Sequence, residues 1–248
     1  MAFHVRRTGS GPPVLLVHGS IQNSFTWTRQ LRLGDEFTLI LPDRPGYPPN
    51  PPLASNDLGH SIDFDVQAGE MAELLGEGAH LAGFSYGGVI ALLAAARRPE
   101  AVWSLTVIEP PCLGVARGVP AVEETVAAYE RAYGLEDMEE FVARFAAVFG
   151  PEGRVPSVVA AGDEQGARAL MAERAPWEAE IPLRALAEAG FPVLVCSSGG
   201  HPAYEAVCDV LARELGAERA ILPGAGHGVQ WAHGFNDIFA GFLRSARR

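Results

Sequence analysis

The sequence predicts an α/β fold with a mostly parallel central sheet covered by helices on both faces. Short apolar runs alternate with helical patterns over residues 1–111 and again over residues 190–248. Such runs are typical of strands that are buried on both faces of a parallel sheet. Between residues 112 and 189 the alternation stops and only helical patterns follow one another. We therefore expect one α/β core, made of 1–111 and 190–248, and an all-helical lid at 112–189.

Up to residue 75, apolar runs alternate with segments that suit helices or loops. An alternation of apolar and polar residues indicates an edge strand, whereas a short unbroken apolar run indicates a buried strand. A stretch rich in proline cannot continue a helix or a central strand, so we expect a surface loop there. The expected elements are strands at 3–7, 14–17 and 37–41, helices at 25–33 and 63–75, and a proline-rich loop at 47–56.

The most informative segment is Gly83-Phe84-Ser85-Tyr86-Gly87, which fits the pattern G-x-S-x-G. The apolar run 80–82 precedes it, and the helical segment 88–98 follows it and ends before Pro99. A serine between a strand and a helix lies in a sharp turn, whose strained backbone exposes the hydroxyl at the carboxyl end of the sheet. The flanking glycines avoid a clash of Cβ atoms. The free N–H groups of the helix N-terminus point toward the same place.

After this sharp turn, the elbow at Ser85, strand and helix patterns continue to alternate, with one interruption. A buried strand is expected to end just before Glu109, and three helical segments follow it without a strand between them. Strand patterns return after residue 190. The expected elements are strands at 103–108, 192–197 and 219–222, lid helices at 120–133, 136–149 and 163–174, core helices at 202–215 and 235–244, and a glycine-rich loop at 223–228.

Composition and charge exclude several classes of protein. Of the 248 residues, 48% are hydrophobic and 20% are charged, which is typical of a globular protein. The formal net charge of -11 argues against binding to nucleic acid or to an anionic membrane surface. No run reaches the roughly 18 apolar residues of a membrane span, and the N-terminus lacks a signal-peptide core. The three cysteines form no metal or disulfide pattern, so we expect a cytoplasmic protein with reduced thiols.

Four landmarks occur in a fixed order along nearly the whole chain. They are His18-Gly19 after the first buried strand, Ser85 in the elbow, the helical insert after the next strand, and Gly224-Ala225-Gly226-His227 after the last strand. In this order the sequence resembles the α/β-hydrolase superfamily. The resemblance implies the fold strongly and the substrate only weakly, because this fold supports many kinds of chemistry.

The expected catalytic pair is a serine and a histidine. A serine hydroxyl needs a base to remove its proton, and histidine, whose pKa is about 6.5, suits that task near neutral pH. We therefore expect Ser85 to be the nucleophile and His227 to be the base. The resemblance further implies an oxyanion hole made by the backbone N–H groups of Ser20 and Tyr86. Such groups stabilise negative charge as it develops on the substrate oxygen.

The residues that contact the substrate are less well determined by the sequence. Ile21 and Trp27 are candidates to line the pocket, with simple packing as an equal alternative. Aromatic side chains recur at helical spacing in the expected lid, and we expect most of them in the lid core and a minority facing the substrate. These aromatic residues are Tyr129, Tyr133, Phe141, Phe145 and Phe149.

The expected catalytic acid departs from the usual family pattern. The resemblance implies a carboxylate after the strand that follows the lid, but that position holds Ser198-Gly199-Gly200-His201, with the histidine roughly where an aspartate is usual. A histidine there cannot hold a negative charge against a protonated His227. The other position that the resemblance offers is the end of strand 103–108, where the sequence has Glu109. Since neighbouring strands lie about 4.8 Å apart, we expect Glu109 to reach His227, the alternative being a carboxylate that bonds only backbone groups.

These expectations describe a serine hydrolase that forms an acyl-enzyme and needs no cofactor or metal. The expected substrate is a small, mostly apolar ester or acyl compound, and hydrolysis of a thioester or of a C–C bond stays open. A second class is a non-catalytic protein that binds a small molecule on the same fold. The missing carboxylate after strand 192–197 favours that class, whereas the pair of Ser85 and His227 argues against it. Both a monomer and a homodimer fit the sequence.

Overall fold

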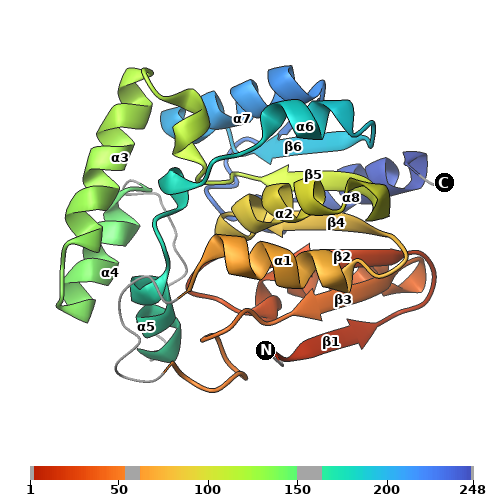
Figure 1. Cartoon of the computed structure of the whole chain (residues 1–248), viewed down its shortest axis with the longest axis horizontal. Coiled ribbons are helices and arrows are strands. Elements are labelled where there is room, and N and C mark those ends of the chain that lie inside the picture. Colours follow the sequence, from red (N-terminus) through yellow and green to blue (C-terminus); the bar gives the residue numbers. More distant parts are fainter. Residues whose placement is uncertain (1–2, 54–61, 150–163, 247–248) are drawn as a thin grey trace.

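The computed structural model describes residues 3–53, 62–149 and 164–246. Within these residues the chain forms a seven-stranded sheet with the order β1-β3-β2-β4-β5-β6-β7 (Figure 1). The first strand pairs antiparallel with the third, and the other neighbours pair in parallel. The predicted α/β fold with a mostly parallel sheet is therefore confirmed. The strands are β1 (Val5–Thr8), β2 (Pro13–Val17), β3 (Thr38–Pro42), β4 (Ala79–Phe84), β5 (Val102–Ile108), β6 (Val193–Ser197) and β7 (Glu218–Ile221).

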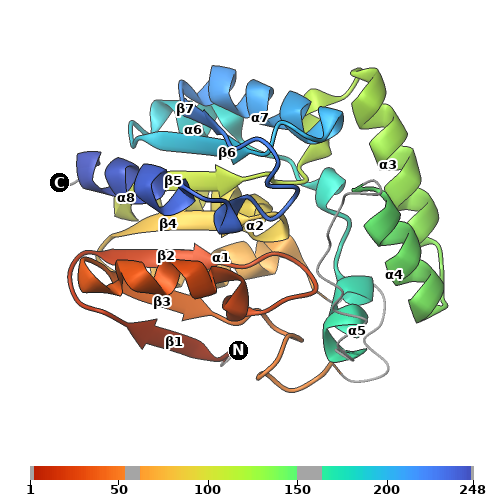
Figure 2. The same cartoon turned by 180° about the vertical axis from the view of Figure 1, so that it is seen from behind.

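Two sets of helices cover the two faces of the sheet, as Figures 1 and 2 show from opposite sides. Side chains alternate along each strand, so that in β2 Leu15 and Val17 join one apolar cluster while Val14 and Leu16 join the other. The first cluster is closed by α1 (Phe64–Leu74), α2 (Tyr86–Arg97) and α7 (Pro202–Leu215). The second is closed by the 3-10 helix η1 (Ser24–Asp35) and by α8 (Phe235–Ser245).

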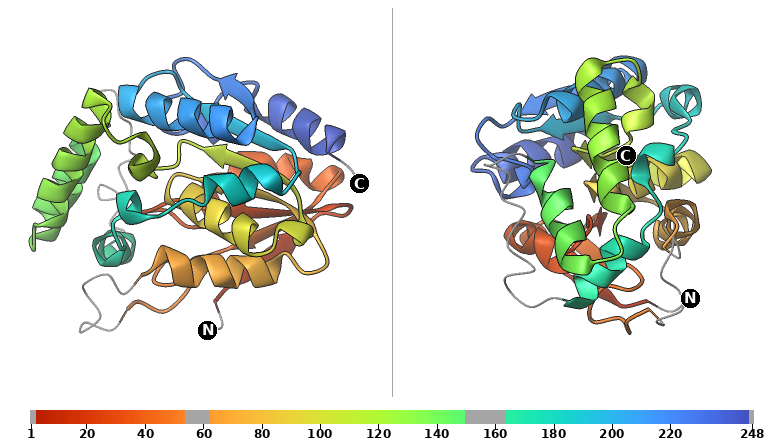
Figure 3. Two further views of the ribbon diagram at one scale, coloured as in Figure 1. Left: turned by 45° about the horizontal axis from the view of Figure 1, so that its top comes forward. Right: turned by 90° about the vertical axis from the view of Figure 1, so that its left-hand side faces the viewer.

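The described residues between β5 and β6 carry helices and no strand. Helices α3 and α4 pack against each other and lie beside the carboxyl end of the sheet (Figures 1 and 3), whereas α6 packs against α7 and α2. The division into a core and a lid at 112–189 stays a prediction. The elements of this region are η3 (Leu113–Ala116), α3 (Pro120–Tyr133), α4 (Met138–Ala147), α5 (Glu164–Ala172), η4 (Pro176–Glu178) and α6 (Leu183–Glu188).

The predicted strands and helices begin and end within two residues of the observed ones. Two differences have physical reasons. The expected helix at 25–33 is the 3-10 helix η1, in which the Thr28 hydroxyl donates to the Phe25 carbonyl and so competes with α-helical hydrogen bonding. Helix α6 was not expected, because six residues offer too few apolar positions for a periodic pattern. Residues 54–56 of the expected loop and residue 163 of an expected helix lie outside the described residues.

Helix α2 is the most deeply placed of the helices that position the site. It is buried from Tyr86 to Ala95 between the sheet and α1. Its 12 residues are far fewer than the roughly 20 that cross a bilayer. Within the described ranges, no helix combines the length and the apolar character of a membrane span.

Candidate active site

Ser85 lies in the sharp turn between β4 and α2. Its backbone has φ 52° and ψ -125°, a conformation that side-chain-bearing residues rarely adopt. The turn is closely packed, since a Cβ atom on Gly83 would lie 2.2 Å from the Gly87 carbonyl oxygen. A Cβ atom on Gly87 would lie 2.4 Å from the carbonyl oxygen of His18. Both glycines are therefore required by close approach of the backbone.

His227 lies in the loop after β7 and connects the serine to a carboxylate. Its Nε2 is 2.9 Å from Ser85 Oγ, and its Nδ1 is 2.6 Å from Glu109 Oε2. Three aromatic rings surround the imidazole, with centroids 5.0 Å (Phe84), 4.4 Å (Phe149) and 5.1 Å (Tyr204) away. These rings limit the access of water to the imidazole, whose side chain is 12% exposed.

The sheet register explains how Glu109 reaches this position. Phe84 of β4 pairs with Ile108 of β5, so the residues that follow them leave the sheet side by side. The backbone N–H of Ser85 donates to the carbonyl of Ile108 at 2.9 Å. Glu109 itself has φ 42°, a second strained residue at the carboxyl end of the sheet.

Glu109 is a buried carboxylate with donors on both oxygens. Its Oε1 accepts hydrogen bonds from the backbone N–H of Ser198 at 2.7 Å and from the Ser198 hydroxyl at 2.6 Å. Burial by itself raises the pKa of Glu109, but the hydrogen bonds from His227 and Ser198 and the attraction of His227 outweigh burial and lower it. The ionised carboxylate therefore favours the tautomer of His227 that carries its proton on Nδ1 and leaves Nε2 as an acceptor toward Ser85.

His201 takes no part in this hydrogen-bonded chain. Its Nε2 lies 2.9 Å from the carbonyl oxygen of Val148, and its ring packs edge-on against Tyr204 at 5.0 Å. The segment that would carry the acid in the usual family pattern instead supplies the two Ser198 donors to Glu109. After β6, where the family pattern has a carboxylate, this chain therefore has hydrogen-bond donors to Glu109.

Ser20 and Tyr86 both lie beside Ser85. Strand β2 neighbours β4 in the sheet, so the loop that follows β2 reaches the elbow. This approach is close, because a Cβ atom on Gly19 would lie 2.9 Å from the Cβ atom of Ser85. Ser20, Ser85 and Tyr86 line one pocket. The role of the Ser20 and Tyr86 N–H groups as an oxyanion hole stays a prediction.

His18 organises the loop that carries Ser20. It is fully buried, its Nδ1 lies 2.7 Å from the Gly19 carbonyl oxygen, and its Nε2 accepts the backbone N–H of Arg44 at 2.8 Å. Burial and then the nearby Arg44 charge hold the pKa of His18 well below its usual value. His18 is therefore a neutral side chain that ties two loops together.

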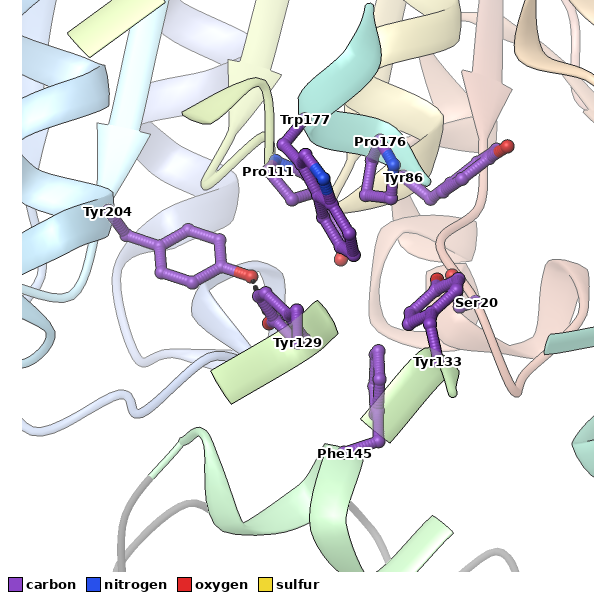
Figure 4. A pocket seen from close by; sticks show the side chains of 10 residues that line it. Ser20, Tyr86, Pro111, Tyr129, Tyr133, Phe145, Pro176, Trp177 and Tyr204 are labelled. Carbon is purple, nitrogen blue, oxygen red and sulfur yellow. Dashed lines mark hydrogen bonds between the residues drawn. The ribbon is translucent and has the colours of Figure 1, made fainter. Parts of the chain in front are cut away.

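The pocket above Ser85 is small and mainly aromatic (Figure 4). The empty space among its lining residues, including the part that is open to solvent, is about 250 Å³. Figure 4 shows the hydroxyls of Tyr129 and Tyr204 hydrogen-bonded to each other, and their oxygen atoms are 2.8 Å apart. None of the described residues that line the pocket is charged. They are Ser20, Ser85, Tyr86, Pro111, Tyr129, Tyr133, Phe145, Pro176, Trp177 and Tyr204.

The two other pocket candidates from the sequence, Ile21 and Trp27, are not among these lining residues. Trp27 is a residue of η1, and it is completely buried in the apolar cluster that η1 and α8 close. Ile21 is 5% exposed and packs against Phe141 and Leu170 of the helical region between β5 and β6. The structure therefore favours the packing alternative for both residues.

Sequence reasoning missed three residues that complete the site: Trp177, Ser198 and Tyr204. Trp177 and Tyr204 line the pocket, and Ser198 holds Glu109. Of the five lid aromatics, Tyr129, Tyr133 and Phe145 line the pocket, which is a majority rather than the expected minority. The only signal in the sequence that could have indicated Trp177 is its position, as a large aromatic residue between two helical segments. In the described residues, no group of three or more His, Cys, Asp or Glu side chains is placed to hold a metal ion.

Comparisons with known proteins identify the family to which the fold belongs. The profile of the alpha/beta hydrolase family matches residues 14–240. The chain is 32% identical over 198 residues to a pimeloyl-[acyl-carrier protein] methyl ester esterase of Aeromonas hydrophila, covering 78% of this chain and 72% of that protein. It is 31% identical to the protein of the same name from Aeromonas salmonicida, covering 60% of this chain and 58% of that one. Among solved structures, MenH from S. aureus matches with a TM-score of 0.74 at 16% identity, covering 99% of both chains.

Proposed function

The chain belongs to the alpha/beta hydrolase family, and we propose that it is a serine-dependent hydrolase of a small carboxylic ester or related acyl substrate. One observation carries the proposal, namely the continuous hydrogen-bonded chain from Ser85 Oγ through His227 to Glu109, with distances of 2.9 and 2.6 Å. A protein that only binds a ligand has no need of this arrangement. The relatives named as methyl ester esterases support the same class of substrate.

In the proposed first step, Ser85 Oγ attacks the carbonyl carbon while His227 Nε2 takes its proton. Glu109 stabilises the imidazolium that forms, since its carboxylate keeps its negative charge beside Nδ1. The C=O electron pair moves to oxygen, and the N–H groups of Ser20 and Tyr86 are proposed to stabilise that negative charge. One such donor contributes about 3–4 kcal/mol to the transition state.

The tetrahedral intermediate then collapses, which completes the first half of the reaction. The bond to the leaving group breaks, and His227 gives the leaving oxygen its proton, so that an alcohol departs and an acyl-Ser85 ester remains. A water molecule then attacks this ester while His227 takes one of its protons. The carboxylic acid leaves, and the proton returns from His227 to Ser85 Oγ.

The pocket supports a small, uncharged acyl group as the substrate. Its lining is uncharged and mostly aromatic, which suits an apolar acyl group. Burying a charged group among its aromatic side chains without a partner would be costly. Thioesters share the same acyl chemistry and stay within the proposal. We also propose a cytoplasmic location, because all three cysteines are buried and free.

The test is hydrolysis of a series of p-nitrophenyl esters from two to eight acyl carbons, measured with the wild type and with Ser85→Ala. We expect turnover by the wild type that is highest for the shorter acyl chains, and no turnover above the uncatalysed rate for Ser85→Ala. Folding of the variant is checked by thermal unfolding. A wild type that hydrolyses none of the esters, and that a fluorophosphonate does not label, would favour a binding protein on the same fold.

A further inference from the structure

A buried ion pair lies next to the site, and the proposed reaction does not use it. Arg44 Nη2 lies 2.5 Å from Glu173 Oε1, and both side chains are completely buried. Arg44 follows β3, whereas Glu173 follows α5 in the helical region between β5 and β6. Because moving two charges out of water is costly, a pair in this place calls for an explanation.

Both charges hold the loop that carries Ser20. Arg44 Nη1 donates to the carbonyl of Gly19 at 2.9 Å. The Ser20 hydroxyl donates to Glu173 Oε2 at 2.5 Å. The ion pair thus fixes two successive residues of the loop, one through its backbone and one through its side chain.

A tyrosine extends the same network by one residue. The Tyr47 hydroxyl donates to Glu173 Oε1 at 2.8 Å, and it lies 3.4 Å from the backbone nitrogen of Ile21. Ile21 has φ 70°, in the left-handed region that β-branched residues avoid. A strained backbone persists only when its surroundings hold it in place, and here Tyr47, which is itself bonded to Glu173, contacts the Ile21 backbone.

The ion pair also contacts the second proposed oxyanion residue. The Arg44 guanidinium lies over the Tyr86 ring, 4.5 Å from its centroid. The Tyr86 hydroxyl donates to the carbonyl of Arg174, the residue after Glu173, at 3.0 Å. Residues 173 and 174 therefore contact the side chains of both residues whose N–H groups are proposed to face the substrate oxygen.

We propose that Glu173 is a positioning residue for the oxyanion hole. Paired with Arg44, it holds Ser20 and Tyr47, and through them it fixes the direction of the Ser20 backbone N–H. The inference rests on the proposed function, because it concerns the N–H group that would stabilise the transition state. If the Ser20 N–H is still present but points in another direction, the enzyme should bind the transition state less tightly. Its binding of the substrate should be nearly unchanged.

The test uses two variants that keep the ion pair intact. Ser20→Ala removes the hydroxyl that bonds Glu173 but keeps the backbone N–H, and Tyr47→Phe removes a bond to Glu173 at a residue that does not line the pocket. We expect kcat for a p-nitrophenyl ester to fall about 10- to 100-fold in each variant, with KM changed by less than about twofold. The affinity for a boronic acid, which forms a tetrahedral adduct with the serine, should fall by the same factor. Ser20→Thr, which keeps a hydroxyl, should restore most of kcat.

A matched control is Ser104→Ala, which removes a buried hydroxyl that is hydrogen-bonded to His80 in the core. It should leave kcat and KM at the wild-type values, so that a fall in kcat cannot be assigned to lost stability. Wild-type kcat in both Ser20→Ala and Tyr47→Phe would overturn the inference, as would an effect on KM alone. A wild type that neither hydrolyses esters nor reacts with a fluorophosphonate would instead overturn the proposed function, and the inference with it.

Discussion

Replacing Glu109 by glutamine tests how the carboxylate fixes the proton on His227. Glu109 Oε1 faces the Ser198 backbone N–H, a donor that cannot rotate away. The single oxygen of a glutamine at this position would therefore face Ser198, and its NH₂ group would face His227 Nδ1. An NH₂ group needs an acceptor, so Nδ1 would lose its proton and Nε2 would gain one. In this tautomer Nε2 cannot accept the proton of Ser85.

The expected loss follows from this inverted tautomer. The corresponding acid-to-amide change in a serine triad costs about 10⁴-fold in kcat, which is about 5 kcal/mol at the transition state. The assay is kcat on a short-chain p-nitrophenyl ester, with thermal unfolding as the check of folding. Ser198→Ala is the control, since it keeps the charge of Glu109 and the backbone donor and should cost no more than about tenfold. If Glu109→Gln kept more than about a tenth of the wild-type kcat, the reasoning from the tautomer would be refuted.

Three further predictions concern stability. Burial raises the pKa of Glu109 and hydrogen bonding to its carboxylate lowers it, with a net fall below 4.5. The ionised carboxylate should therefore stabilise the fold above about pH 4.5, and the denaturant stabilities of the wild type and Glu109→Gln should converge as the pH falls through the lowered pKa. Glu173→Ala leaves the Arg44 charge buried without its partner and should lower the free energy of unfolding by about 3–5 kcal/mol; a change below about 1 kcal/mol would show that water reaches the charge. Gly83→Ala places a Cβ atom 2.2 Å from the Gly87 carbonyl oxygen, so it should distort the elbow and reduce both melting temperature and activity; unchanged values would contradict the close packing.

Local patterns explain why the strands and helices could be predicted from the sequence. Strand β2 is an unbroken apolar run with a turn on each side, and α7 begins at Pro202 and ends before Gly216, so neither needs tertiary contacts to be recognised. The elbow combined a glycine pattern with its place between a strand and a helix. Helix α6 was not predicted because six residues are too few for a periodic pattern, and the 3-10 form of η1 was not predicted because apolar spacing does not distinguish it from an α-helix.

The residues of the site also fall into those that the sequence could predict and those that it could not. Ser85, Glu109 and His227 each follow a recognisable strand, so the sequence could bring them to one edge of the sheet. The residues that hold them in place follow no comparable sequence pattern. The bond between Ser198 and Glu109 spans 89 positions, and the pair of Arg44 and Glu173 spans 129. Contacts of this kind arise from the packing of loops, which no local periodicity describes.

The central claim is that Ser85 is a nucleophile activated by His227, and covalent labelling tests it most directly. The wild type, Ser85→Ala and His227→Gln are treated with a fluorophosphonate, and the adduct is located by peptide mass spectrometry. We predict one adduct, on Ser85, in the wild type, none in Ser85→Ala, and labelling of His227→Gln slowed by at least about a thousandfold. A wild type that stays unlabelled, or an adduct on another residue that survives in Ser85→Ala, would contradict the account.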